Sequence, residues 1–280
     1  MITINKSILK KVYKKRKKHA HKGDFGRLLI IGGSVKYTGA PALNALAALA
    51  SLKTGVDIVE VAAPKRAADI IASFSPNLIT IPLKGNYLNR SHLKKLLNES
   101  KNKNAFVIGS GISRNKQTTS LVKSFLKQIN ILGVIDADAI HAIASNKNKI
   151  NLQDFVLAPH SGEFKALTGI TPNNNLKKRI KQVKQIAGKL NTTILLKGPI
   201  DIISNGRQLA INKTGSPYMT VGGTGDVLSG ILGSLIAQNN NLFNSACASA
   251  YINGLAAELS KKKSSLIATD LLKQIEKIVG

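Results

Sequence analysis

The amino-acid sequence predicts an α/β protein built on a predominantly parallel, doubly wound sheet with helices on both faces. Three observations support this fold class. Short apolar runs alternate with segments of helical periodicity along most of the 280 residues. Apolar residues make up 43% of the chain but aromatic residues only 4%, and an Ala/Ile/Leu/Val interior of this kind suits parallel strands covered by helices. Most of the apolar runs also end in glycine or polar residues, where open α/β sheets bind their ligands.

A basic segment precedes the first predicted strand. Residues 1–22 contain Lys14-Lys15-Arg16-Lys17-Lys18 and are expected to form a basic arm or helix. Residues 23–280 are expected to form one domain, because they contain no internal repeat and no long Gly/Ser/Pro linker. Within them, residues 28–31 are continuously apolar and lead into Gly32-Gly33-Ser34, which predicts a buried strand and a tight loop.

An Ala/Leu-rich helix is predicted next. It opens at Gly39-Ala40-Pro41, because proline is tolerated in the first helical turn, and runs to about Lys53, with Gly55 closing it. Further strands are predicted at residues 58–61, 78–81, 106–108, 134–135, 155–157, 193–196 and 202–203. Helical periodicity marks residues 118–129, 176–190, 227–237, 243–259 and 268–278. Residues 201–211 predict a hairpin that turns at Asn205-Gly206.

The composition favours a cytoplasmic protein. The single Cys247 excludes an internal disulfide framework and fits a reducing compartment. No apolar run reaches membrane-spanning length, and the N-terminus lacks the long apolar stretch of a secretory signal. We therefore expect no membrane partner.

The formal net charge of +27 leaves two classes of partner open. A basic field attracts nucleic acid non-specifically, but it also suits an enzyme for small anionic ligands. The basic runs are scattered over helix-like segments, as solvated helix faces usually are, and the aromatic residues that interleave a single-strand binding surface are missing. No specific nucleic-acid partner is expected.

The most informative motif is the glycine-dense stretch of residues 222–230, which brings Asp226 to the start of an apolar helix. Glycines let backbone N–H groups approach an anion, and a helix N-terminus adds a favourable dipole. A carboxylate there repels phosphate, so affinity for phosphate does not explain it. It is explained if Asp226 takes a proton from a hydroxyl while the loop holds a phosphoryl group. The motif thus predicts phosphoryl transfer to an alcohol.

Polar residues at other predicted strand ends have two interpretations each. Asp136 and Asp138 would point to the same face of an extended strand, where Mg²⁺ could join them, or Asp138 could cap the next helix. His160, with Glu163 near a helix start, is either structural or functional. Lys197 follows an apolar strand and either reaches a nucleotide phosphate or extends along the surface.

The sequence contains a weak match to a dinucleotide-binding fingerprint and no P-loop motif. Gly109-Ser110-Gly111 has Arg114 where a dinucleotide fingerprint needs its third glycine, so it fits an ordinary turn as well as a ligand loop. No glycine-rich run ends in Gly-Lys-Ser/Thr, which argues against a P-loop enzyme. The histidines show no zinc-ligand spacing.

Taken together, these segments resemble the ADP/ATP-dependent NAD(P)H-hydrate dehydratases, a ribokinase-like, carbohydrate-kinase-related family of nicotinamide repair enzymes. The matching segments occur in order through nearly the whole chain. They are His21-Lys22-Gly23-Asp24-Phe25-Gly26, Gly32-Gly33-Ser34, Tyr37-Thr38-Gly39-Ala40, Asp136-Ala137-Asp138-Ala139, Ala158-Pro159-His160-Ser161-Gly162-Glu163, Leu196-Lys197-Gly198 and the glycine-rich motif around Asp226.

The resemblance implies a single ribokinase-like catalytic domain, with a three-layer α/β/α fold, over residues 23–280. The implied reaction dehydrates the S epimer of NADHX or NADPHX to NADH or NADPH. ADP is the expected phosphoryl donor, giving AMP and phosphate, with ATP as the other option and Mg²⁺ as the cofactor. Asp226 would deprotonate the ring hydroxyl as it attacks the terminal phosphoryl group, and phosphate would then leave. We also expect the protein to form a homo-oligomer, such as a tetramer.

The same resemblance implies the site residues. The hydrate would be bound by Ala40, Gly109, Gly111, His160 and Asp226. The adenine nucleotide would be bound by Lys197, Gly198, Pro199, Ile200, Asp201, Gly223, Thr224 and Gly225. Glu163 corresponds to an acidic position that helps to place magnesium in ribokinase-like enzymes.

The chain departs from the family pattern at three places. Ser113 stands where a further glycine is usual, residues 215–219 contain Ser and Tyr where Asn and Gly are expected, and Asp201 replaces a common Thr. Two alternatives remain. One is a vitamin or sugar kinase of the same fold, which would release a phosphorylated product. The other is a basic nucleic-acid-binding protein without turnover, which predicts a steep salt dependence.

Overall fold

One sheet forms the centre of the molecule. The structure is a computed structural model that describes residues 1–13, 19, 21, 23–51 and 56–279. Within these residues the sheet has ten strands in the order β1-β10-β9-β8-β7-β6-β5-β2-β3-β4. They are β1 (Ile2–Thr3), β2 (Arg27–Ile31), β3 (Ile58–Pro64), β4 (Ile79–Leu83), β5 (Ala105–Ile108), β6 (Leu132–Ile135), β7 (Phe155–Leu157), β8 (Thr193–Leu196), β9 (Asp201–Ser204) and β10 (Leu209–Asn212). Only the β8–β9 and β9–β10 pairs are antiparallel in this set, which confirms a predominantly parallel sheet.

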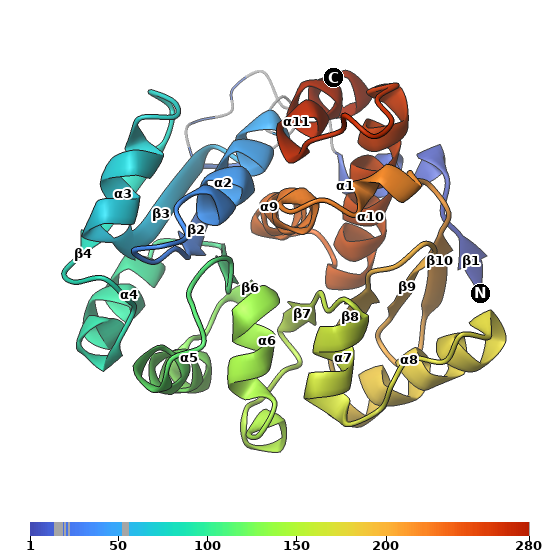
Figure 1. The fold of residues 1–280 in the computed structure, drawn as a ribbon, viewed down its shortest axis with the longest axis horizontal. Coiled ribbons are helices and arrows are strands. Elements are labelled where there is room, and N and C mark those ends of the chain that lie inside the picture. The colour runs from blue at the N-terminus through green and yellow to red at the C-terminus, as the bar shows by residue number, and fades with distance from the viewer. Residues whose placement is uncertain (14–18, 20, 22, 52–55, 280) are drawn as a thin grey trace.

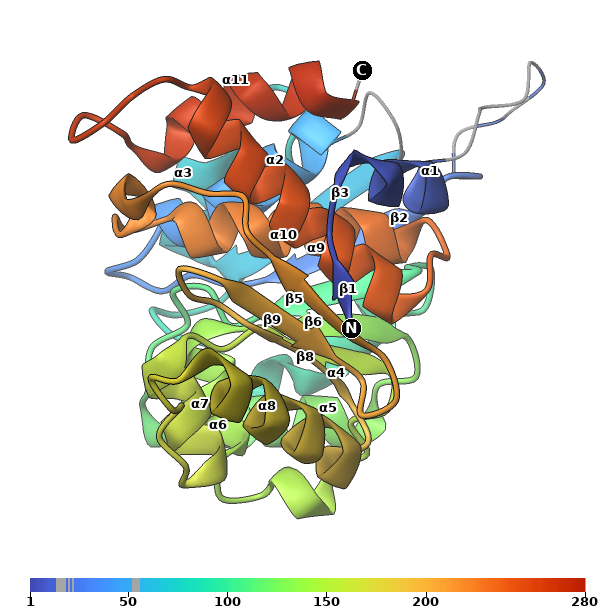
Figure 2. The same ribbon diagram turned by 90° about the vertical axis from the view of Figure 1, so that its right-hand side faces the viewer.

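Helices cover both faces of the sheet (Figure 1). One layer contains α1 (Leu9–Val12), α2 (Gly39–Ala50), α3 (Lys65–Ala72), α9 (Thr224–Ala237), α10 (Leu242–Leu259) and α11 (Ala268–Val279). The opposite layer contains α4 (Leu93–Ser100), α5 (Lys116–Gln128), α6 (Ala137–Ile143), α7 (Ser161–Thr168) and α8 (Leu176–Leu190). The turned view in Figure 2 shows the same separation, so the three-layer α/β/α architecture is confirmed.

Strand β2 shows why the central runs are continuously apolar. Its side chains alternate between the two faces of the sheet. Leu28 and Ile30 pack in the core under α2 and α9, while Leu29 and Ile31 pack in the core under α5 and α6. All four are fully buried. A strand covered on both faces has no solvent side, so no alternation of polar residues appears in its sequence.

Most predicted elements lie where the sequence pattern places them. The hairpin is confirmed: β9 and β10 pair antiparallel, and Gly206 in the turn has φ = 87°, which favours glycine. The helix after Pro41 ends at Ala50 rather than near Lys53. The predicted end at Gly55 lies outside the described residues.

The first 13 residues belong to the packed domain. Strand β1 pairs in parallel with β10, and Ile4, Ile8 and Val12 are buried in the core beside α10. Residues 6–12 of the predicted basic arm or helix are helical, and these apolar side chains attach this part to the sheet. The run Lys14–Lys18 lies outside the described residues.

The carboxyl ends of β2, β5, β6, β7 and β8 meet at one edge of the sheet, because these strands are parallel neighbours. Helix α9 begins at the same edge and packs very closely on α2. A Cβ on Gly230 would lie 2.1 Å from the carbonyl oxygen of Asn44, so only glycine permits this approach. Among the described helices, none combines the length and apolar character needed to cross a membrane.

Candidate active site

The glycine-rich motif forms a tight turn into α9, as predicted. Gly223 is the N-cap residue with φ = 97°, a conformation that disfavours other residues. A Cβ there would also approach Leu43 and Ala268 within 3 Å. The hydroxyl of Thr224 donates to the carbonyl of Met219 at 2.9 Å, which ties the turn to the preceding loop. The first backbone N–H groups of α9 are thus held in a fixed position, where they suit an anion.

Asp226 lies in the first turn of α9, and its backbone is fixed by α2. The side-chain amide of Asn44 donates to the Asp226 carbonyl at 2.7 Å. Burial raises the pKa of the Asp226 carboxyl to about 7, with Asp136 and Glu163 adding to the rise and Ser110 and Lys197 opposing it. A carboxyl with a pKa near 7 is suited to act as a general base at neutral pH.

Lys197 extends from the end of β8 into a group of carboxylates. Its Nζ lies 2.7 Å from Asp136 Oδ1 and 3.9 Å from Glu163 Oε2. Burial alone would lower the pKa of Lys197, but these two carboxylates more than offset that effect and the pKa is raised. The lysine is therefore charged, and its charge faces the carboxyl of Asp226 as well. This ion pair excludes the alternative that the Lys197 side chain extends along the surface.

The predicted pairing of Asp136 with Asp138 is wrong. Strand β6 ends at Ile135 and α6 begins at Ala137, so the two carboxylates are not on one face of a strand. Asp136 caps α6 and also accepts from Ser229 Oγ at 2.6 Å, while Asp138 accepts from Arg114 Nε at 2.7 Å. The helix cap, which was predicted at Asp138, is Asp136 instead.

His160 and Glu163 form a capping box at the start of α7. His160 Nδ1 accepts from the backbone N–H groups of Gly162 and Glu163, and Glu163 Oε2 accepts from the N–H of His160 at 2.8 Å. Nδ1 is an acceptor here, so the proton of a neutral imidazole is on Nε2, which lies 3.3 Å from Glu163 Oε1. Burial raises the pKa of Glu163. His160 therefore has a structural role, and its half-exposed ring also faces the pocket described next.

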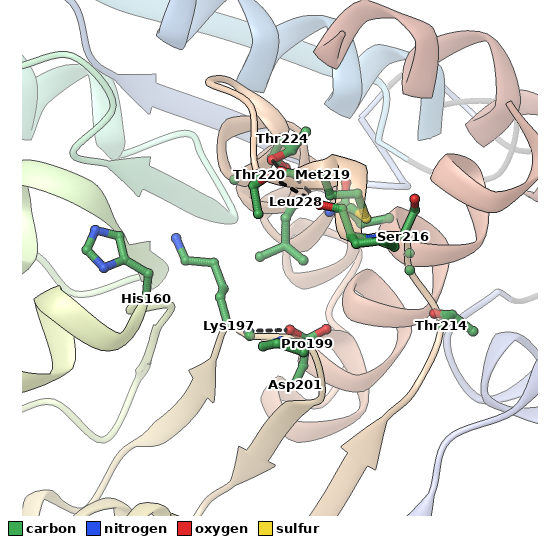
Figure 3. Close-up of a pocket in the computed structure, with 16 residues that line it drawn as sticks. His160, Lys197, Pro199, Asp201, Thr214, Ser216, Met219, Thr220, Thr224 and Leu228 are labelled. Atoms are coloured by element: carbon green, nitrogen blue, oxygen red, sulfur yellow. Dashed lines mark hydrogen bonds between the residues drawn. The ribbon is translucent and has the colours of Figure 1, made fainter. Parts of the chain in front are cut away.

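A pocket of about 650 Å³ opens beside these residues (Figure 3). Lys197 and His160 lie at one side of it, Thr214 and Ser216 lie at the other, and Asp201 lies beside Pro199 below Lys197. The predicted residues that line it are His160, Lys197, Gly198, Pro199, Asp201, Thr224 and Gly225. The lining residues that sequence reasoning did not assign are Thr214, Gly215, Ser216, Pro217, Met219, Thr220, Leu228, Asn253 and Gly254. Close packing of Gly254 on Thr214, where a Cβ would lie 2.4 Å from the hydroxyl, joins α10 to this wall.

The predicted residues Ala40, Gly109 and Gly111 lie outside the pocket lining, and Ser110, between the two glycines, helps to lower the pKa of Asp226. Gly109 has φ = 135°, and a Cβ there would lie 1.8 Å from the carbonyl oxygen of Asp136. Gly111 lies against Tyr37 and Ala40: a Cβ on it would be 2.8 Å and 3.5 Å from their Cβ atoms. Ile200, Gly223 and Glu163 support the site without lining the pocket.

Together, the mainly parallel three-layer sheet and the glycine turn that presents a buried carboxyl define a protein of ribokinase-like fold. Solved structures agree. A ribokinase-like superfamily protein of Enterococcus faecalis superposes with a TM-score of 0.85 and 23% identity, covering 99% of this chain and 95% of that one. The ADP/ATP-dependent NAD(P)H-hydrate dehydratase of Bacillus subtilis, co-crystallised with ATP/Mg²⁺, superposes with a TM-score of 0.82 and 22% identity, covering 99% and 97%.

Sequence similarity then identifies the family. The family model described as NAD(P)H-hydrate dehydratase matches residues 28–279. The ADP-dependent (S)-NAD(P)H-hydrate dehydratase of Nitrosopumilus maritimus is 40% identical, covering 99% of this chain and 96% of that one. The bifunctional NAD(P)H-hydrate repair enzyme of Pyrobaculum aerophilum is 38% identical, and the match spans 94% of this chain but about half, 52%, of that protein. The chain belongs to the NAD(P)H-hydrate dehydratase family.

Proposed function

We propose that this protein dehydrates the S epimer of NADHX or NADPHX to NADH or NADPH and consumes ADP as phosphoryl donor. The observation that carries this proposal is the placement of the Asp226 carboxyl, with a pKa of about 7, at the glycine-lined start of α9. Relatives at up to 40% identity that are named ADP-dependent (S)-NAD(P)H-hydrate dehydratases support the substrate and the donor.

The site has two sides that suit the two substrates. The pocket beside Lys197 and Gly225 lies in the range of about 300–1,000 Å³ that is typical of small-molecule sites, and its position at the anion-binding turn suits the nucleotide. The loops that carry Ala40 and Gly111 lie against each other, and the hydrated nicotinamide ring is proposed to bind there. Asp226 would then lie beside the point where the ring hydroxyl meets the terminal phosphoryl group.

The reaction follows from this arrangement. Asp226 accepts the hydroxyl proton as the hydroxyl oxygen bonds to the terminal phosphorus of ADP, and the bond from that phosphorus to AMP breaks. The N–H groups of residues 223–225 and the charge of Lys197 stabilise the transferring phosphoryl group. Phosphate then leaves the ring with the former hydroxyl oxygen, and loss of a ring proton completes the double bond. Hydroxide is a poor leaving group and phosphate a good one, which is the reason for consuming a nucleotide.

The residues present fit Mg²⁺ that enters with the nucleotide. Among the described residues there is no group of three or more His, Cys, Asp or Glu side chains that could hold a metal by itself. Mg²⁺ commonly binds through substrate phosphates, waters and one or two carboxylates, so this does not exclude it. Glu163 and Asp136, which both face Lys197 Nζ, are the carboxylates that would hold it. When bound, Mg²⁺ would neutralise phosphate charge.

The test is to incubate the purified protein with (S)-NADHX, ADP and Mg²⁺, and to follow the absorbance of regenerated NADH together with AMP and phosphate. The proposal requires NADH, AMP and phosphate in equal amounts. Absence of NADH with both ADP and ATP would refute it. Accumulation of a stable phosphorylated hydrate would instead support the kinase alternative.

A further inference from the structure

The carboxyl of Asp201 is held rigidly in the wall of the nucleotide pocket. The backbone N–H of Gly198 donates to Oδ1 at 3.0 Å, and the side-chain amide of Asn212 donates to Oδ2 at 3.1 Å. Asn212 is in turn fixed, because the same amide donates to the carbonyls of Thr214 and Ala250. The carboxyl thus cannot rotate freely, which is the condition for selective recognition of a ligand.

This carboxyl keeps acceptor capacity toward the pocket. An ionised carboxylate has about four lone-pair positions and no donor, and two donors reach Asp201 among the described residues. Burial raises the pKa of Asp201 to about 6, so the group is mainly ionised at pH 7. A ligand group beside it must therefore donate a hydrogen bond.

The charges in the pocket separate the phosphates from this acceptor. Lys197 Nζ and the N-terminus of α9 form the cationic side of the pocket. The Lys197 side chain points away from Asp201 (Figure 3). A carboxylate repels phosphate, so the phosphates belong to that side. The ribose adjoins the phosphates in a nucleotide, whereas the amino group of adenine lies at the far end of the base. Asp201 binds the backbone N–H of Gly198, the residue that follows Lys197, so it adjoins the cationic side and lies within reach of the ribose rather than of that amino group.

We propose that Asp201 accepts a hydrogen bond from the ribose 2′- or 3′-hydroxyl of the bound nucleotide and so makes the pocket selective for ribonucleotides over deoxyribonucleotides. This inference rests on the proposed use of an adenine nucleotide. A Thr hydroxyl at position 201 would lack the negative charge and the second oxygen of this carboxylate.

Calorimetric titration of the full chain with ADP, 2′-deoxy-ADP and 3′-deoxy-ADP, in the presence of Mg²⁺, tests the proposal without any mutation. At least one of the two deoxynucleotides should bind about 10-fold or more weakly than ADP, since a hydrogen bond to a charged group is lost. Equal affinity for all three nucleotides, or no binding of any of them, would overturn the inference.

Two variants then assign the discrimination to one residue. In Asp201→Thr and Asp201→Asn, affinity for ADP should fall toward that of the weaker deoxynucleotide, so that the gap shrinks to about threefold or less. Asp154→Asn changes the charge by the same amount at an exposed position before β7 and should leave the discrimination unchanged. Undiminished discrimination in both Asp201 variants, with native circular dichroism, would overturn the assignment.

The same nucleotides in the turnover assay separate this inference from the proposed function. Discrimination in binding without NADH formation would refute the dehydratase proposal and leave the role of Asp201 standing. NADH formation with equal kcat/KM for ADP and both deoxynucleotides would support the dehydratase proposal and refute the role of Asp201.

Discussion

At the scale of single residues, Asp226 is the proposed base because of where the chain places it. The carboxyl is buried at the first turn of α9, its backbone is fixed by Asn44, and its pKa is raised to about 7. A solvent-exposed aspartate would be ionised but too weak a base to draw a proton from an alcohol at useful speed. Burial therefore converts an ordinary acid into a base that matches neutral pH.

Replacement of Asp226 by Asn should abolish turnover while nucleotide binding survives. The amide cannot accept the hydroxyl proton, so kcat should fall by about 10²–10⁴-fold. Steady-state kinetics and calorimetric titration with ADP give the two numbers. Activity within a few-fold of the unmodified protein would remove Asp226 as the base.

The same carboxyl predicts the acid limb of the pH profile. Only the ionised form accepts a proton, so kcat/KM should rise about tenfold per pH unit below 7 and level off above about 8. ADP affinity must be measured over the same range, because protonation of Asp201, whose pKa is about 6, also weakens binding. A kcat that stays flat from pH 5.5 to 8 would contradict the assignment.

At the scale of elements, the contact between α2 and α9 holds the catalytic turn. Gly230 lies against the backbone of Asn44, the residue whose side chain fixes Asp226. A side chain at position 230 would push the two helices apart and move the carboxyl.

Gly230→Ala should therefore lower both stability and kcat. The added Cβ would lie 2.1 Å from Asn44 O, and overpacking of this kind costs about 1–3 kcal/mol or more. Gly39→Ala is the matched control, because no atom lies within 4 Å of a Cβ there and alanine favours the helix. Denaturant unfolding measures both variants. Equal stability of the two would show that the close approach does not matter.

The elements also show what sequence patterns reveal. Strand β2 and the β9–β10 hairpin were predictable, because a doubly covered strand is continuously apolar and Asn-Gly favours a tight turn. Strand β1 was not predicted, since two residues have no period. Helix α3 was missed because Lys65 and Arg66, in its first turn, resemble a polar strand end.

Among the candidate site residues, local motifs pointed to Asp226 and Lys197. The ion pair of Asp136 with Lys197 joins residues 61 apart in sequence, so it has no local signal.

At the scale of the whole molecule, the net charge of +27 is expected to attract the two anionic substrates that we propose. Such a field raises the rate at which anions arrive, and salt screens it over about 10 Å at 0.1 M. The charge belongs to the surface as a whole, so its effect should be on binding and not on the chemical step.

Raising NaCl from about 0.05 to 0.5 M should thus lower kcat/KM for ADP several-fold and leave kcat nearly constant. Kinetics at fixed Mg²⁺ and pH provide the measurement. A kcat that falls as steeply as kcat/KM would mean that salt acts on the site or the fold instead.

The central claim is that a hydroxyl is phosphorylated and then leaves as phosphate. The most direct measurement uses hydrate whose ring hydroxyl carries ¹⁸O, with unlabelled ADP and solvent. Mass spectrometry of the released inorganic phosphate should find one ¹⁸O per phosphate, because the hydroxyl oxygen departs bonded to phosphorus. Unlabelled phosphate, with the ¹⁸O released to water, would contradict the claim.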